Sequence, residues 1–193
     1  MADGNPQDAN REDANPYAFG YGSLIWNPGF DYLSSQKAML RGAHRSLSIY
    51  SHRHRGTPER PGLVFGLSRG GSCLGVAFEI DPPNWDAVFA YLEAREQDRG
   101  VYRTVFRQVE LASGRSVRAL AYLVNEEHPQ FAGRLSVAAQ VDLIRTGTGE
   151  SGPNTEYVRN TAKHLLQLGI RDRILDEIVA ALDGDENLVT PSA

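Results

Sequence analysis

The chain has 193 residues with 41% hydrophobic and 23% charged positions, a composition typical of a globular protein that buries a core without disulfides. Twenty basic and 24 acidic side chains leave a net charge of −4, so no overall positive field exists to attract nucleic acid or an anionic membrane. The single cysteine, Cys73, excludes an internal disulfide and favours a reducing, cytoplasmic location.

The domain organisation follows from where apolar residues occur. Residues 1–16 are almost wholly polar or small and predict a flexible leader, and residues 183–193 predict a flexible tail. Between them, residues 17–182 are expected to form a single domain. No run approaches about 18 apolar residues, and the N-terminus has no basic segment followed by an apolar one. The sequence therefore predicts neither a membrane span nor a secretion signal.

The first element expected is a strand that breaks into a glycine-rich loop. Residues 17–24 begin with aromatic residues of high strand propensity and continue into Gly20 and Gly22. Apolar runs, several of them alternating with polar residues, predict further strands at His44–Ser51, Leu63–Leu67, Leu74–Ile80, Arg103–Leu111 and Val117–Val124. This pattern predicts a mainly antiparallel sheet or barrel.

Helices are expected among and after these strands, which makes the fold class α+β. Apolar residues at helical spacing and terminal Pro and Gly signals predict four of them, between Pro83 and Gly100, over Leu135–Arg145, from Pro153 to Leu168, and over Arg171–Leu182.

A carboxylate interrupts the apolar face of the first predicted helix. That face holds Trp85, Phe89 and Leu92. Four residues further along the same face is Glu96, whereas Glu93 is expected to point elsewhere. Apolar surroundings raise the pKa of a carboxylate and make it a proton acceptor near neutral pH, so Glu96 is a candidate general base. Two structural interpretations stay open: the helix has frayed by Glu96, or the carboxylate pairs with Arg95, Arg99 or Arg103.

Two glycine-rich segments could present backbone N–H groups to an anion. Residues 20–24 would do so at the end of a strand, although a plain glycine turn is the alternative. Residues 147–152 match the dinucleotide-binding pattern G-x-G-x-x-G, but a helix precedes them, and so we reject that function and expect a loop before a helix start. His52 and His54 have no third ligand at recognisable spacing, so no metal site is expected.

Four blocks in the same order resemble the ChaC-like γ-glutamylcyclotransferases, over about residues 17–168. They are Phe19–Trp26, His54–Pro58, Arg95–Glu96 with Tyr102–Arg103, and Ser151–Tyr157. The spacing between Arg95 and Tyr102 resembles the bacterial branch. The resemblance implies a small mixed β-barrel with flanking helices, no cofactor, and the conversion of reduced glutathione to 5-oxoproline and cysteinylglycine.

The resemblance also implies roles for particular residues. The family's catalytic glutamate falls on Glu96, expected to take a proton from the substrate's α-ammonium and to return one to the leaving nitrogen. We expect backbone amides of the first block to bind the γ-glutamyl unit, two tyrosines to line the pocket and one arginine to hold a carboxylate. These substrate-binding residues are Tyr21, Gly22, Ser23, Leu24, Arg55, Tyr102 and Tyr157.

Two other functions stay open from the sequence. The chain could be a cyclotransferase of the same fold for another γ-glutamyl compound, which the His54–Pro58 block disfavours. It could also be a non-catalytic regulatory protein that kept the pocket, which Glu96 on the apolar face disfavours. The expected partner is a small molecule, glutathione, and the sequence does not predict an oligomeric state.

Overall fold

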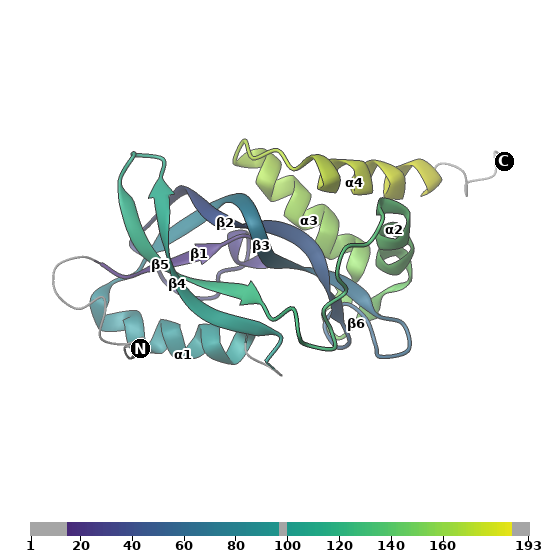
Figure 1. Cartoon of the computed structure of the whole chain (residues 1–193), viewed down its shortest axis with the longest axis horizontal. Helices are drawn as coiled ribbons and strands as arrows, with labels where there is room; N and C mark the ends of the chain where they lie inside the picture. Colours follow the sequence, from purple (N-terminus) through teal and green to yellow (C-terminus); the bar gives the residue numbers. More distant parts are fainter. Residues whose placement is uncertain (1–14, 97–99, 187–193) are drawn as a thin grey trace. The chain divides into compact units, whose positions relative to one another are not determined.

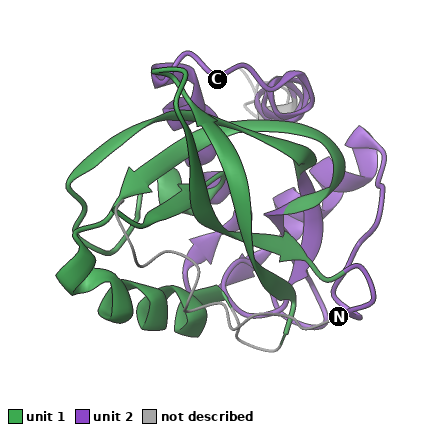
Figure 2. Ribbon diagram, turned by 60° about the vertical axis from the view of Figure 1, so that its left-hand side comes forward, with its two compact units in different colours: residues 1–45, 67–125 green, residues 46–66, 126–193 purple. Residues whose placement is uncertain are grey.

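The computed structural model describes residues 15–96 and 100–186 (Figure 1). Most of the predicted leader, residues 1–14, lies outside the described residues, as does the end of the predicted tail, residues 187–193. The described chain divides into two compact units, one made of residues up to 45 with 67–125, the other of 46–66 with the residues from 126 onward (Figure 2). Each unit is described in turn.

Five strands close a barrel in the first unit. They are β1 (Tyr17–Gly20), β2 (Ser34–Ser51), β3 (Gly62–Glu79), β4 (Tyr102–Leu111) and β5 (Ser116–Val124). Their order around the barrel is β1-β3-β2-β4-β5, and β1 closes it by pairing parallel to β5. Residues 46–51 of β2 and 62–66 of β3 belong to the second unit. The expected α+β class and small mixed barrel are confirmed.

Strand β1 is buried along its whole length. It pairs antiparallel with β3 on one side and parallel with β5 on the other, so both of its edges are occupied. All four of its residues are buried, as in a strand covered on both faces, and Tyr17, Ala18 and Phe19 are each at most 2% exposed. The loop that follows β1 therefore starts from a fixed point in the barrel.

Strand β3 reverses direction at two glycines. Gly70 and Gly71 have φ values of 88° and 70°, which suit the two central residues of a type I′ turn. The pairings agree: β3 runs parallel to β5 at Leu67, whereas residues 76–79 run antiparallel to β1, which is itself parallel to β5. The two strands predicted around these glycines are thus the two arms of a hairpin.

Helix α1 (Trp85–Glu96) packs on β4 and β5. A 3-10 turn, η3 (Pro82–Asn84), precedes it and starts at the two prolines. The Trp85 and Phe106 ring centroids lie 6.4 Å apart, and Val88 and Leu92 are the buried residues of the helix. Figure 1 shows α1 in teal, alongside the long β4–β5 hairpin. The predicted helix is confirmed, with its most buried side at Val88 and Leu92.

The second unit holds three helices that pack on one another. They are α2 (Val137–Thr146), α3 (Asn154–Gln167) and α4 (Arg173–Glu186). The Ser136 hydroxyl accepts a hydrogen bond from the Ala139 N–H at 3.2 Å and so caps the start of α2. Gly169, with φ of 66°, follows the end of α3 as predicted. Helix α4 continues to Glu186, four residues beyond the predicted end at Leu182.

The start of α3 is joined to residues 62–66. Asn154 is fully buried, and its side chain accepts from the Leu63 N–H at 2.6 Å and donates to the Leu63 carbonyl at 2.8 Å. One turn later the Tyr157 hydroxyl accepts from the Phe65 N–H at 3.1 Å. These bonds satisfy buried backbone groups of β3 that would otherwise cost free energy.

Over the described residues, no helix combines the length and the apolar character that crossing a membrane requires.

Candidate active site

Glu96 is the last residue of α1 and is largely buried. It lies four residues after Leu92 and eight after Val88, on the buried side of the helix. Only 15% of its side chain is exposed. Helix α1 includes Glu96, which answers the interpretation that the helix has already frayed there. The position predicted from the apolar pattern is therefore confirmed.

Burial controls the electrostatics of Glu96. Loss of hydration raises the pKa of its carboxyl group above the ordinary glutamate value, and the Arg95 guanidinium opposes this. Arg95 Nε lies 3.5 Å from Glu96 Oε1, so the expected pairing with Arg95 is present together with the burial. Arg99 lies outside the described residues. A buried carboxylate with a raised pKa suits a group that takes and returns a proton.

The 21–28 loop follows β1 and contains the first of the predicted binding blocks. It begins with a 3-10 turn, η2 (Ser23–Ile25), in which the Ile25 N–H donates to the Gly22 carbonyl at 3.0 Å. Because the bonds of such a turn run three residues back, the Ile25 N–H is its first donor, and the N–H groups of Ser23 and Leu24 come before it and are not used by the turn. The loop thus has the successive backbone amides that the sequence predicted.

Tyr21 fixes this loop to the barrel. Its ring is 5% exposed, its hydroxyl donates to the Tyr122 carbonyl at 3.2 Å, and its own carbonyl accepts from Arg45 Nε. Leu24 is equally buried. The side chains of Tyr21 and Leu24 therefore hold the loop in place, and the role expected of these two residues concerns their backbone amides.

Arg95 connects the loop to Glu96. Its Nη2 donates to the Ser23 hydroxyl at 3.0 Å while its Nε faces the Glu96 carboxylate. Both groups expected to act on the substrate, the loop and the carboxylate, are therefore held by one guanidinium. The sequence pointed to Arg95 only as a partner of Glu96. The signal for a larger role was that Arg95 directly precedes Glu96 in the resembling block.

The expectation for Glu93 is wrong. Instead of pointing elsewhere, Glu93 Oε1 accepts a hydrogen bond from Thr104 Oγ1 at 2.7 Å and another from the Tyr122 hydroxyl at 2.9 Å. Residues three apart share a helix face, so Glu93 and Glu96 both face the barrel. Burial first, and then the charges of Glu93 and Glu96, raise the pKa of Tyr122. Sequence reasoning missed Tyr122 because it looked like an ordinary strand aromatic.

The remaining predicted residues divide between the units. Tyr102 begins β4, paired with Val124 of β5, and is half-buried in the first unit. Arg55 and Tyr157 belong to the second unit, where the Arg55 guanidinium lies 5.4 Å from the centre of the Tyr157 ring and donates to the Pro153 carbonyl at 3.2 Å. Within that unit, the second and fourth resembling blocks are thus in contact.

The segment that matches G-x-G-x-x-G forms a small hairpin. Strands β6 (Thr148–Gly149) and β7 (Gly152–Pro153) pair antiparallel, after α2 and before α3. A Cβ on Gly149 would lie 2.2 Å from the Arg53 carbonyl oxygen, and Gly152 has φ of 96°. These glycines are required by close backbone packing and by a left-handed conformation. The arrangement agrees with rejecting a dinucleotide-binding site.

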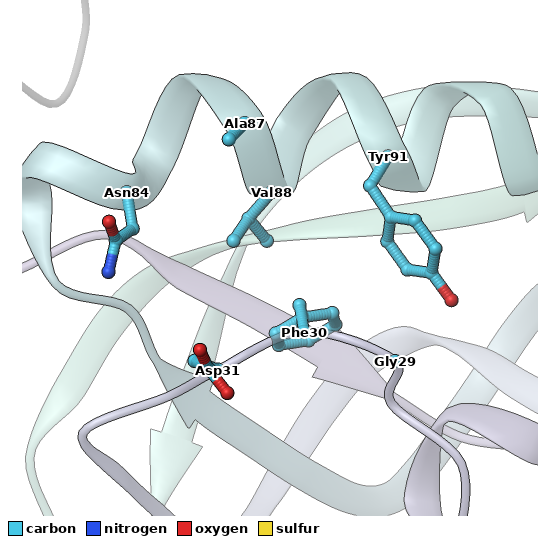
Figure 3. Close-up of a pocket in the computed structure, with 7 residues that line it drawn as sticks. All are labelled: Gly29, Phe30, Asp31, Asn84, Ala87, Val88 and Tyr91. Atoms are coloured by element: carbon cyan, nitrogen blue, oxygen red, sulfur yellow. The ribbon is translucent and has the colours of Figure 1, made fainter.

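A cavity of about 300 Å³ lies beside α1 and is lined in part by its buried residue Val88. Figure 3 shows its lining, Gly29, Phe30, Asp31, Asn84, Ala87, Val88 and Tyr91. None of the predicted site residues is among them, but the hydroxyl of Tyr91, which lines the cavity, accepts a hydrogen bond from Arg95 at 2.9 Å. Among the described residues, no group of three or more histidine, cysteine, aspartate or glutamate side chains is placed to hold a metal ion.

Comparison with known proteins gives a matching family and several relatives. The family model described as ChaC-like protein matches residues 17–184. The glutathione-specific γ-glutamylcyclotransferase of Escherichia coli is 30% identical over 90% of this chain and 76% of its own length. The glutathione-specific γ-glutamylcyclotransferase 1 of Danio rerio is 33% identical over 83% of this chain and 84% of its own length.

Solved structures also share the fold. A yeast γ-glutamylcyclotransferase described as specific to glutathione superposes with a TM-score of 0.81, covering 89% of this chain and 97% of that protein. Its sequence identity is 23%, so this likeness concerns the arrangement of strands and helices. A Bacillus subtilis protein, YkqA, superposes with a TM-score of 0.56 over 89% of this chain and 55% of its own.

Proposed function

This chain belongs to the ChaC-like family, and from that premise we propose that it is a glutathione-specific γ-glutamylcyclotransferase with Glu96 as general acid and base. The observation that carries the proposal is the buried Glu96 carboxylate held beside the amide-bearing 21–28 loop. The names of the Escherichia coli and Danio rerio relatives support the choice of substrate.

The reaction needs a proton acceptor more than a nucleophile. Glu96 takes a proton from the α-ammonium of the γ-glutamyl unit, and the resulting amine nitrogen attacks the γ-carbonyl carbon. The new C–N bond closes the five-membered ring of 5-oxoproline, and the bond to the cysteinyl nitrogen breaks. Protonated Glu96 gives its proton to that nitrogen, which leaves as the amine of cysteinylglycine. The ring nitrogen still carries a second proton, which Glu96 takes and passes to the released amine, so that the products are the neutral lactam and an ammonium and Glu96 is again ionised. A tethered nucleophile gives large proximity gains, so the protein must mainly fix geometry and move the proton.

The predicted substrate-binding residues keep their roles in this proposal. The amides of the 21–24 segment bind the γ-carbonyl oxygen or the α-carboxylate, and Tyr102 lines the pocket. Arg55, which suits a carboxylate as a planar hydrogen-bond donor, binds a substrate carboxylate, and Tyr157 contacts the substrate. Glutathione is the thiol of reducing compartments, and the single cysteine of the chain is consistent with activity in the cytoplasm.

The test is release of the two products by the purified protein. Incubated with reduced glutathione, the wild-type protein should yield equal amounts of 5-oxoproline and cysteinylglycine, measured by mass spectrometry. Glu96→Gln keeps the shape of the side chain but cannot accept the proton, and should lower turnover by a factor of about 100 or more. Glu110→Gln, at an exposed position of β4, is the matched control and should retain turnover.

Two results would contradict this proposal. Substantial turnover by Glu96→Gln would remove Glu96 from the mechanism. Faster release of 5-oxoproline from a γ-glutamyl amino acid or γ-glutamylamine than from glutathione would give the chain a different substrate.

A further inference from the structure

The Arg95 guanidinium is surrounded by oxygen atoms from separate parts of the first unit. Besides Ser23 and Glu96, its Nη1 faces the Asn27 carbonyl at 2.8 Å, the Pro28 carbonyl at 3.2 Å and the Tyr91 hydroxyl at 2.9 Å. Three of these acceptors are in the 21–28 loop, at its start and at its end. The arginine is itself only 21% exposed.

The geometry of these contacts requires an arginine. A guanidinium offers five N–H donors in one plane, and here all three nitrogens face an oxygen. Nη1 has two hydrogens for three oxygens, so one hydrogen is shared. A lysine ammonium is a single charged point on a flexible stem and cannot reach acceptors spread around the edge of such a plane.

A simpler role would be a favourable charge at the end of a helix. Arg95 is the basic residue in the last turn of α1, where a cation interacts well with the helix dipole. That role needs a positive charge and no particular hydrogen bonds, so lysine would fulfil it equally. The two carbonyls, the tyrosine hydroxyl and the serine hydroxyl around Arg95 are contacts beyond what the helix dipole accounts for.

We infer that Arg95 is a positioning residue, which holds the 21–28 loop against the last turn of α1 so that the loop amides and the Glu96 carboxylate keep one fixed arrangement. The consequence for catalysis rests on the proposed function; the consequence for the loop does not. Arg95 acts through the loop and through Glu96 and makes no bond to the reacting atoms. Errors of about 1 Å in such arrangements reduce rates by about 100-fold.

The charge of Arg95 can be separated from its hydrogen bonds. Two titratable groups act with Glu96: Arg95 on α1 lowers its pKa, and Tyr122 on β5, whose hydroxyl donates to Glu93, feels the Glu96 charge. Arg95→Lys keeps the positive charge and loses the planar set of donors. Arg95→Gln loses both. Arg107→Gln, an exposed arginine of β4 that donates to the carbonyl of its neighbour Phe106, is the matched control.

The kinetic experiment measures kcat and KM for glutathione against pH. Arg95→Lys should lower kcat/KM by about tenfold or more. The midpoint of the acidic limb of its pH profile should stay within a few tenths of a pH unit of the wild-type midpoint. Arg95→Gln should lower kcat/KM at least as far and move that limb to higher pH, because the Arg95 charge lowers the pKa of Glu96. Arg107→Gln should stay within about twofold. If Arg95→Lys also stays within twofold, a helix-end charge suffices and the inference is overturned.

A second measurement does not depend on activity. Backbone amides of the 21–28 loop donate within the loop, as the Trp26 and Asn27 N–H groups do to the Ser23 carbonyl. Hydrogen exchange in the peptide covering this loop should be at least about tenfold faster in both Arg95 variants than in the wild type and in Arg107→Gln. Unchanged exchange would overturn the inference. If the wild type is inactive on glutathione but exchange is still faster in the two Arg95 variants as expected, only the proposed function is overturned.

Discussion

At the scale of single residues, the chemistry depends on where Glu96 keeps its proton. Burial raises the pKa of this carboxyl group, and Arg95 limits the rise. The mechanism uses the ionised form as base, so a raised pKa reduces the active fraction at acidic pH. Removing the Glu96 carboxylate from water therefore costs stability, but it also brings the pKa of this group closer to neutral pH.

The pH dependence of kcat/KM follows from this. As the pH falls through the raised pKa of Glu96, the base becomes protonated and kcat/KM should fall about tenfold per pH unit. The midpoint should lie above the ordinary glutamate value of 4.5. A profile recorded from about pH 4 to pH 8 checks this. A midpoint at or below the ordinary value would mean that another group, or a solvated Glu96, controls the rate.

Glu93 should matter for stability. Glu93→Ala removes the acceptor of the buried Tyr122 hydroxyl and should lower the free energy of unfolding by about 1–3 kcal/mol, whereas Glu93→Gln keeps an oxygen there and should cost less. Urea unfolding measures both. Glu110→Ala breaks only an exposed pair with Arg41 and should cost under about 1 kcal/mol. Equal losses for Glu93→Ala and Glu110→Ala would show that the Tyr122 bond contributes nothing.

At the scale of elements, close packing of β1 against β3 sets the starting point of the 21–28 loop. Gly75 of β3 lies so near that a Cβ there would be 2.4 Å from the Gly20 carbonyl oxygen and 2.7 Å from the Phe19 ring. Neither the backbone oxygen nor the buried ring can move without shifting β1. This contact fixes the position of the 21–28 loop, because the loop begins where β1 ends.

Gly75→Ala should therefore destabilise the protein by about 1–3 kcal/mol, the usual cost of overpacking a core. Thermal unfolding followed by circular dichroism gives the change in Tm. Gly184→Ala in α4 is the control, because its Cβ would meet nothing within 4 Å and alanine favours helix, so stability should rise by about 0.5 kcal/mol. A Gly75→Ala protein as stable as the wild type would mean that β1 and β3 can separate at no cost.

The elements also show what a single sequence reveals. Helix α1 and hairpin β4–β5 were predicted because their apolar residues repeat at the right period. The first ten residues of β2 were missed, since Ser34–Ala43 contains few β-branched or aromatic residues, and its strand conformation depends on pairing with β4. The contacts of Glu93 and Arg95 were also out of reach, because they join α1 to segments distant in the chain.

At the scale of the whole molecule, each compact unit is built from two separate stretches of chain. The second unit contains residues 46–66, which the chain reaches early, and the helices that begin after residue 126. Asn154 and Tyr157 supply hydrogen bonds to Leu63 and Phe65. This interleaving was not predictable from the sequence, where composition gives no boundary between residues 17 and 182.

A chain that ends at Asn125 should therefore fail to fold. It retains residues 46–66 but loses α2, α3 and α4, so buried backbone groups of β3 lose their partners. We expect such a fragment to show no cooperative thermal transition and rapid proteolysis, and co-expression with residues 126–193 to restore both properties. Cooperative melting of the fragment alone would contradict the interdependence of the two stretches.

The only cysteine of the chain, Cys73, lies inside β3 and is 3% exposed. A thiol introduced at the exposed position Asn27 would consequently be the one that a maleimide dye reaches in the folded protein. Fluorescence anisotropy or quenching from that dye would then report the motion of the 21–28 loop in real time, with the native cysteine left in place.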